Sequence, residues 1–170
     1  MNHLLAAQLT EEAFRPFGTV SDVSDLTGLL TIHAAYEAGE PASEPVLQLV
    51  KIESIPQPLT IARLEIHPHS AQTFLSLDMA PSLVVVCEPN AAGEPDMATA
   101  RAFIARPTQV VTYNRGVLHH RLTPLKTPAV FAMTMMHSSD GDTIVFDLQE
   151  PIAVAWPDSN AQVAGDWKCS

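Results

Sequence analysis

Short apolar runs of strand length follow one another from Val46 onward, and they limit the possible fold more than any other feature of this chain. The runs are rich in β-branched and aromatic residues, and Pro, Gly, Asn or Asp separates most of them. About eight can be distinguished: "VLQLVKI", "LTIARLEIHP", "QTFLSL", "LVVVCEP", "RAFIA", "QVVTYN", "AVFAMTM" and "TIVFDL". Because no helices alternate with them, the pattern predicts an all-β antiparallel sandwich or barrel.

The remaining segments predict little regular structure. Thr10 can cap a short N-terminal helix, because two acidic residues follow it and stabilise the positive end of the helix dipole. Residues 21–45 are expected to form a loop with one edge strand, and "GEPDMATA" is expected to give at most a helical turn. Asp140-Gly141 predicts a hairpin between the last two runs. We expect one domain over residues 1–170, with its core at about 46–150 and a loose tail from about 157.

The charge balance excludes several classes of partner. The chain has 9 Lys and Arg against 19 Asp and Glu, a net charge of −10. Such a surface repels phosphate backbones and anionic membranes, so neither nucleic acid nor a membrane is an expected partner. The start of the chain lacks the features of a signal peptide, and two cysteines make no disulfide framework. The sequence therefore predicts a cytoplasmic location.

Two groups of histidines have the spacing of metal ligands. His67 and His69 are two residues apart, so on an extended chain they face the same side, and Gln72 follows three residues later. His119 lies on a distant run. Such a set can hold a divalent metal inside a β-barrel, with a further oxygen ligand from Gln, Glu or water. The alternative is that these are core or loop histidines, with His69 in a solvated turn because Pro68 bends the chain.

The adjacent His119 and His120 cannot both face the barrel interior, because successive side chains on a strand alternate between its faces. We expect His119 to point inward near His67 and His120 to point away. Gly116, three residues before His119, is expected to adopt a conformation that larger residues resist.

Arginines beside the predicted strands are candidates for binding an acidic ligand. Arg101 and Arg115 can pair with a carboxylate in the pocket, or they can face solvent, which is the orientation we favour for Arg63. Tyr113 can donate a hydrogen bond to an oxygen in the pocket or serve as a half-buried aromatic. The nearby methionines Met133 and Met135 are expected to fill the core.

Three stretches, "PLTIARLEIHPHSAQTFLSL", "PDMATARAFIA" and "QVVTYNRGVLHHRLTPL", resemble the ureidoglycolate lyase family, and "LTEEAFRPFGTV" resembles that family's N-terminal segment. The resemblance implies a cupin-like double-stranded β-barrel and a homodimer. It also implies a carbon–nitrogen lyase of allantoin catabolism that cleaves ureidoglycolate to glyoxylate and urea. The chain departs from the family where Ile66 replaces an Arg, Asn114 a His and Leu118 an aromatic residue. These departures keep open another cupin-type isomerase or hydrolase acting on a small hydroxy or oxo acid, or a non-catalytic ligand-binding barrel.

The resemblance also implies roles for particular residues. His119 or a hydroxyl activated by the metal is assigned to take the substrate's hydroxyl proton, and Glu65 or His120 to protonate the leaving nitrogen, with Tyr113 beside them. Arg115, Arg101 and Gln72 are assigned to bind the substrate. A divalent Ni, Mn or Zn ion is expected at His67, His69 and His119, and no organic cofactor is expected.

Overall fold

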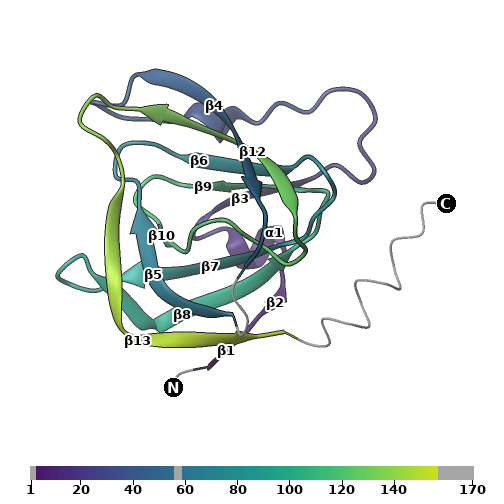
Figure 1. The fold of residues 1–170 in the computed structure, drawn as a ribbon. Helices are drawn as coiled ribbons and strands as arrows, with labels where there is room; N and C mark the ends of the chain where they lie inside the picture. Colours follow the sequence, from purple (N-terminus) through teal and green to yellow (C-terminus); the bar gives the residue numbers. More distant parts are fainter. Residues whose placement is uncertain (1–2, 56–58, 157–170) are drawn as a thin grey trace.

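The computed structural model describes residues 3–55 and 59–156, which form two β-sheets facing each other (Figure 1). The first sheet has, in spatial order, β1 (His3–Leu5), β13 (Ile144–Ala155), β5 (Thr60–Ile66), β10 (Leu118–His119), β7 (Ser82–Pro89), β8 (Pro95–Ala105) and β2 (Ala7–Gln8), with β11 (Thr123–Pro124) also paired to β7. The second has β3 (Gly18–Asp22), β9 (Gln109–Tyr113), β6 (Gln72–Ser76), β12 (Ala129–His137) and β4 (Glu44–Ile52). The predicted all-β, cupin-like barrel is confirmed.

Every predicted apolar run lies in a strand, but two local expectations are wrong. "GEPDMATA" gives no helical turn, because its residues from Pro95 onward extend β8. The turn at Asp140-Gly141 does form, with Gly141 at φ 83°, but it carries the chain from β12 in the second sheet to β13 in the first. Strands β12 and β13 therefore do not pair as a hairpin. Their hydrogen-bonding partners are strands much earlier in the chain, β4 and β6 for β12 and β5 for β13.

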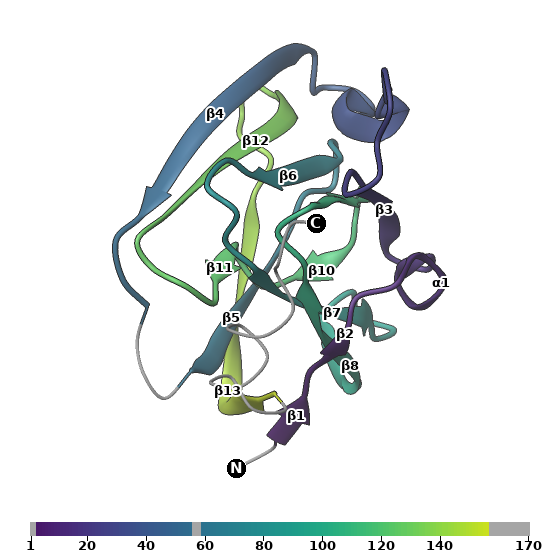
Figure 2. The same cartoon turned by 90° about the vertical axis from the view of Figure 1, so that its right-hand side faces the viewer.

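The short helix α1 (Glu11–Phe14) forms where it was expected, and the Ala13 N–H donates to Thr10 Oγ1 at 3.2 Å as a helix cap. It lies outside the barrel next to β3 (Figure 2). Phe14 is fully buried, with its ring edge-on to those of Phe103 and Tyr113. The segment between β3 and β4 contains a single turn of 3₁₀ helix, η1 (His33–Tyr36), and its only β pairing among the described residues is an isolated bridge of Ala38 with Ser70, so the edge strand expected within residues 21–45 does not form there.

Two apolar clusters stabilise the fold, one on each face of β7. Val84 and Val86 face the second sheet and belong to the cluster between the sheets. Val85 and Cys87 belong to the other cluster, which forms because the first sheet curls until β1 contacts β8. This double burial explains the unbroken apolar run "LVVVC". The core reaches beyond the expected limits of about 46–150, with Leu9, Phe14 and Phe17 before them and Ile152 and Val154 after.

The position of β7 prevents it from forming an interface between two chains. The run "LVVVCEP" is long enough to supply one, but β7 is flanked on both sides and Leu83–Cys87 are buried. The second sheet instead ends at β4, which exposes Leu47 and Leu49 at 63% and 70%. The predicted tail from about residue 157 lies outside the described residues. Within the described part of the chain, no helix is long and apolar enough to cross a membrane.

Candidate active site

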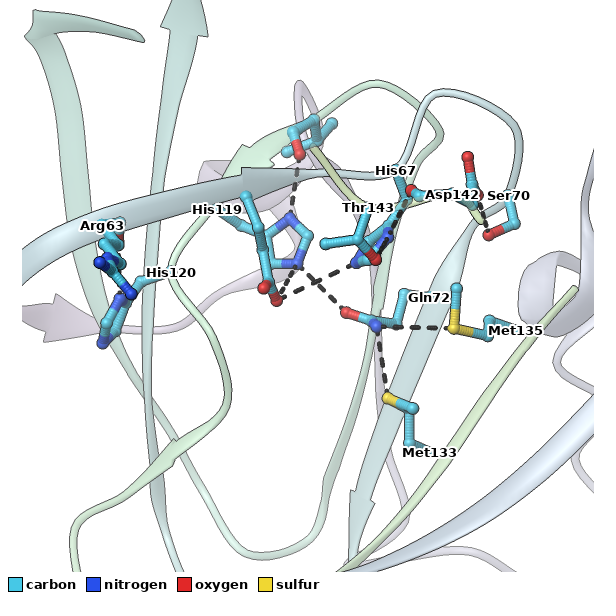
Figure 3. Close-up of polar contacts among 12 residues, drawn as sticks. Arg63, His67, Ser70, Gln72, His119, His120, Met133, Met135, Asp142 and Thr143 are labelled. Atoms are coloured by element: carbon cyan, nitrogen blue, oxygen red, sulfur yellow. Dashed lines mark hydrogen bonds and ion pairs between the residues drawn. The ribbon is translucent and has the colours of Figure 1, made fainter. Parts of the chain in front are cut away.

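Glu65, His67 and His119 bring three possible metal-ligand atoms within 4.8 Å of one another. Glu65 on β5 and His119 on β10 are direct cross-strand partners, so their side chains leave the sheet on the same face. His67 is two residues beyond Glu65 and shares that face. His119 thus lies beside His67, as expected, and the two ring centroids are 5.3 Å apart (Figure 3).

The hydrogen bonds of His119 show which of its ring nitrogens faces the site. Its Nδ1 lies 2.9 Å from the Val117 carbonyl oxygen, which can only accept, so Nδ1 carries a proton. Nε2 then faces two more acceptors, Gln72 Oε1 at 3.1 Å and Glu65 Oε1 at 3.5 Å. Three electron-rich atoms at these distances repel one another unless a proton on Nε2 or a metal cation lies among them. The site is therefore built to hold positive charge.

His67 is oriented in the same way. Its Nδ1 donates to the main-chain carbonyl of Asp142 at 3.0 Å, which leaves Nε2 to face Glu65 Oε1 at 4.0 Å. Nε2 is buried and has no hydrogen-bond partner among the described residues. Burial, together with the nearby His119, lowers the pKa of His67, so its imidazole is neutral near pH 7. A neutral, buried imidazole nitrogen without a partner is suited to bind a metal.

The donor set at this position fits a divalent ion. Two imidazole nitrogens, one carboxylate and the Gln72 amide oxygen are ligands that Zn, Ni and Mn accept. Glu65 occupies the place that the sequence assigned to His69. His69 is half-buried and is not among the three clustered residues, and its main-chain N–H donates to the Asp142 carboxylate at 2.8 Å.

The charge state of Glu65 depends on two opposing effects. Burial raises the pKa of Glu65, but the hydrogen bond and the Coulombic interaction with His119 outweigh it and bring the pKa below its ordinary value. Glu65 is therefore ionised at neutral pH.

Gln72 joins the site from the opposite sheet, on β6. Its amide nitrogen donates toward two thioether sulfurs, Met133 Sδ at 3.3 Å and Met135 Sδ at 3.9 Å. These contacts orient the amide so that its oxygen faces His119. The two methionines were expected to fill the core, and here they also position a polar group.

Tyr113 forms one wall of the site. Its ring stacks on the His119 imidazole with the centroids 4.3 Å apart and the planes 18° from parallel. Burial raises the pKa of Tyr113, and the charge of Glu65 raises it further, so the phenol stays protonated. The contact fixes the plane of the imidazole.

His120 and the two candidate arginines lie elsewhere. His120 points away from His119, and its Nδ1 donates to the main-chain carbonyl of Arg63 at 3.0 Å (Figure 3). Arg115 forms an ion pair with Glu37 at 3.2 Å, and Arg101 lies over the Phe17 ring at 5.7 Å. Gly116 has φ 73°, the left-handed conformation that was expected, and its N–H donates to the His67 carbonyl at 2.9 Å.

A cavity of about 350 Å³ is lined by Glu65 and Gln72, the two residues whose side-chain oxygens contact His119. Most of its walls are apolar and come from both sheets, with contributions from Val50, Ile52, Phe74, Leu122 and Met133. A mostly apolar cavity with a few convergent polar groups is the usual form of a small-molecule site. Neither Arg101 nor Arg115 lines it.

Sequence reasoning missed Asp142, which was assigned only to a turn. Its carboxylate is buried and accepts hydrogen bonds from the His69 N–H and from the Ser70 hydroxyl at 2.7 Å. Its carbonyl accepts from His67 Nδ1. Asp142 therefore fixes both the loop that carries His67 and the tautomer of that histidine. An acidic residue beside Asp140-Gly141 carries no local sign of this role, because its partners lie about seventy residues earlier.

The family model for ureidoglycolate lyase matches residues 1–155. The chain belongs to the ureidoglycolate lyase family. A protein of Agrobacterium fabrum, whose name gives this activity provisionally, is 48% identical over 91% of this chain and 96% of its own length. The ureidoglycolate lyase of Pseudomonas syringae pv. tomato is 37% identical over 71% of this chain and 75% of its own length. The ureidoglycolate lyase of Chelativorans sp. is 30% identical over 93% of this chain and 99% of its own length.

Family membership identifies the chain as a ureidoglycolate lyase-like enzyme and does not favour the alternative cupin-type isomerase, hydrolase or binding barrel. Among solved structures, RmlC from Streptococcus suis aligns over 54% of this chain and 43% of its own, with a TM-score of 0.40 and 9% identity. The residues of the candidate site come from β5 and the segment after it, from β6, β9 and β10, and from the loop before β13.

Replacing Asp142 tests the support of His67. Asp142→Ala should lower the free energy of unfolding by about 2–4 kcal/mol, because two buried hydrogen bonds to a charged carboxylate are lost. Urea denaturation measures this. Asp140→Ala is the matched control, since Asp140 is exposed in the same loop, and it should cost less than about 0.5 kcal/mol. Equal losses for both variants would contradict the assigned role.

Proposed function

We propose that this enzyme cleaves the carbon–nitrogen bond of ureidoglycolate to release urea and glyoxylate, as a step of allantoin catabolism. The main support is one observation: an ionised carboxylate, Glu65, faces a mostly apolar cavity beside two imidazoles. The names of the relatives support the substrate.

The reaction moves one proton from oxygen to nitrogen. The hydroxyl of the substrate loses its proton, its electron pair forms the carbonyl of glyoxylate, and the carbon–nitrogen bond breaks with its electrons going to the urea nitrogen. That nitrogen then takes up a proton. One group that accepts the first proton and returns it to the nitrogen is sufficient for both halves.

Glu65 is our candidate for this group. It is ionised, it lines the cavity, and a carboxylate that has gained a proton becomes an acid of suitable strength. His119 was assigned the base role from the sequence. In the structure the nitrogen that would act as the base, Nε2, is already engaged by Gln72 Oε1 and Glu65 Oε1, which favours a role for His119 in orienting Glu65. His120 points toward Arg63 and does not line this cavity, so we assign it no proton transfer.

We further propose that Oε1 of Glu65, together with His67 and His119, holds a divalent metal ion with the Gln72 amide oxygen beside it, while Oε2 of Glu65 carries out the proton transfer. Such an ion, when bound, lowers the pKa of a coordinated hydroxyl and polarises oxygens of an oxo acid. Gln72 and Tyr113 keep His119 in place, and the apolar walls from Phe74 and Met133 exclude water from around the substrate.

The assay of the purified protein with ureidoglycolate tests the function, and Glu65→Gln tests the mechanism. The amide cannot accept the proton, so kcat should fall by about 10²- to 10⁴-fold while the fold is retained. Release of glyoxylate and urea is measured. Glu12→Gln, which removes an exposed carboxylate on α1, should leave kcat unchanged. The mechanism is wrong if Glu65→Gln retains wild-type kcat, and the function is wrong if the wild-type protein releases neither product.

Metal analysis of protein purified without a histidine tag tests the ligand set. Wild-type protein should contain about one divalent ion per chain, and His67→Ala should lose most of it because a buried imidazole ligand is removed. His69→Ala should retain the ion, since this neighbouring histidine lies outside the cluster. A metal content that falls in both His67→Ala and His69→Ala would support the ligand set predicted from the sequence instead, and a content that is unchanged in His67→Ala would contradict both sets.

We also propose that the protein is a cytoplasmic homodimer joined through β4. This strand is an unpaired edge with two exposed leucines, and such edges readily pair with another chain. Light scattering should give twice the chain mass of 18.4 kDa. A double variant, Leu47→Lys and Leu49→Lys, should shift the mass to that of one chain, because like charges would meet across the interface. A monomeric wild-type protein would disprove the dimer.

A further inference from the structure

A ligand with a carboxylate needs a cationic partner in this protein, because the net charge is −10 and the carboxyl group of Glu65 lines the cavity. The two arginines expected to bind it are engaged elsewhere. Arg115 pairs with Glu37, and Arg101 lies over Phe17. A side chain other than these two must therefore pair with the carboxylate if the proposed metal ion contacts the hydroxyl end of a small acid.

Most of the other basic side chains are also removed from the cavity. Three form ion pairs on the surface: Lys51 with Glu53, Arg63 with Asp147 and Arg106 with Asp22. Arg15 ends helix α1, and Lys126 lies in the segment between β11 and β12. Neither Arg15 nor Lys126 lines the cavity that opens onto Glu65 and Gln72.

We propose that Arg121 binds the carboxylate of the substrate. Arg121 lines this cavity together with Glu65 and Gln72, and it forms no ion pair with any residue in the described ranges 3–55 and 59–156. It follows the inward-pointing His119 by two residues, where the chain leaves β10, and its side chain is exposed. Arg121, which is exposed, and the half-buried Glu65 thus line the same cavity.

This arrangement defines the class of ligand. A guanidinium offers two parallel N–H donors that match both oxygens of a carboxylate, which fixes the ligand's direction as well as its position. A small 2-hydroxy or 2-oxo monocarboxylate held in this way would place its hydroxyl-bearing carbon toward Glu65. Arg121 is then a substrate-binding residue that also determines specificity, because it selects an acid over the corresponding amide. This inference rests on the proposed function for the identity of the acid.

Arg121→Gln tests the inference in two measurements, turnover of ureidoglycolate and binding of glyoxylate by calorimetry. Losing a charge-assisted, two-point contact should raise KM and weaken glyoxylate binding by about 10- to 100-fold, while kcat changes much less. Arg121→Lys should recover only part of the affinity, because an ammonium lacks the paired donors. Arg15→Gln is the matched control, since it removes an exposed guanidinium away from the cavity, and it should alter neither value.

The outcomes separate this inference from the proposed function. If wild-type protein does not turn over ureidoglycolate but binds glyoxylate, and Arg121→Gln weakens that binding, the carboxylate site is supported and the proposed function fails. Unaltered binding in Arg121→Gln overturns the carboxylate site, as does wild-type protein that binds no glyoxylate. A loss produced by Arg115→Gln in place of Arg121→Gln overturns it too. Circular dichroism should show that each variant is folded, which is expected because these side chains are exposed.

Discussion

The pairing of β5 with β10 is the constraint on which the site depends. At this point Glu65 stands opposite His119, and His119 in turn stands opposite Val86 on β7. Strand side chains alternate between the two faces of a sheet. A shift of the register by one residue would therefore turn His119 toward the apolar cluster that contains Val85 and Cys87, and it would bring His120 or Leu118 to the site. Leu118 is fully buried in that cluster, so its burial opposes such a shift. The hydrophobic core thereby selects which histidine is functional.

The second sheet completes the site and determines its polarity. Gln72 approaches from β6, held by two methionine sulfurs, and Tyr113 stacks on His119 from β9. In a cavity with apolar walls, a buried imidazole nitrogen without a partner costs free energy. The fold accepts this cost at His67 Nε2, next to an ionised carboxylate. Polar groups that are unsatisfied within the chain in this way are typical of sites that bind a ligand or an ion.

The loop before β13 links stability with function. Asp142 closes it by hydrogen bonds to the His69 N–H and the Ser70 hydroxyl, and the same residue's carbonyl fixes the tautomer of His67. The connection between the two sheets therefore also orients a site residue. A change in this loop would affect folding and the site together, whereas a change at the exposed Arg121 would affect ligand binding alone.

The sequence by itself determined the strands, the cap at Thr10, the positive φ of Gly116 and the opposite directions of His119 and His120. These features depend on local patterns, namely apolar runs, a capping residue and side-chain alternation, and they can be predicted without knowing the partners of a strand. Tertiary structure alone decided that Glu65 and not His69 lies beside the two histidines, and that β12 and β13 lie in different sheets. It also decided that Arg121 lines the cavity while Arg101 and Arg115 do not. Each of these features depends on which distant strands pair and in what register. Strand pairing is set by the burial of whole faces of the sheets, and no short stretch of sequence encodes that burial.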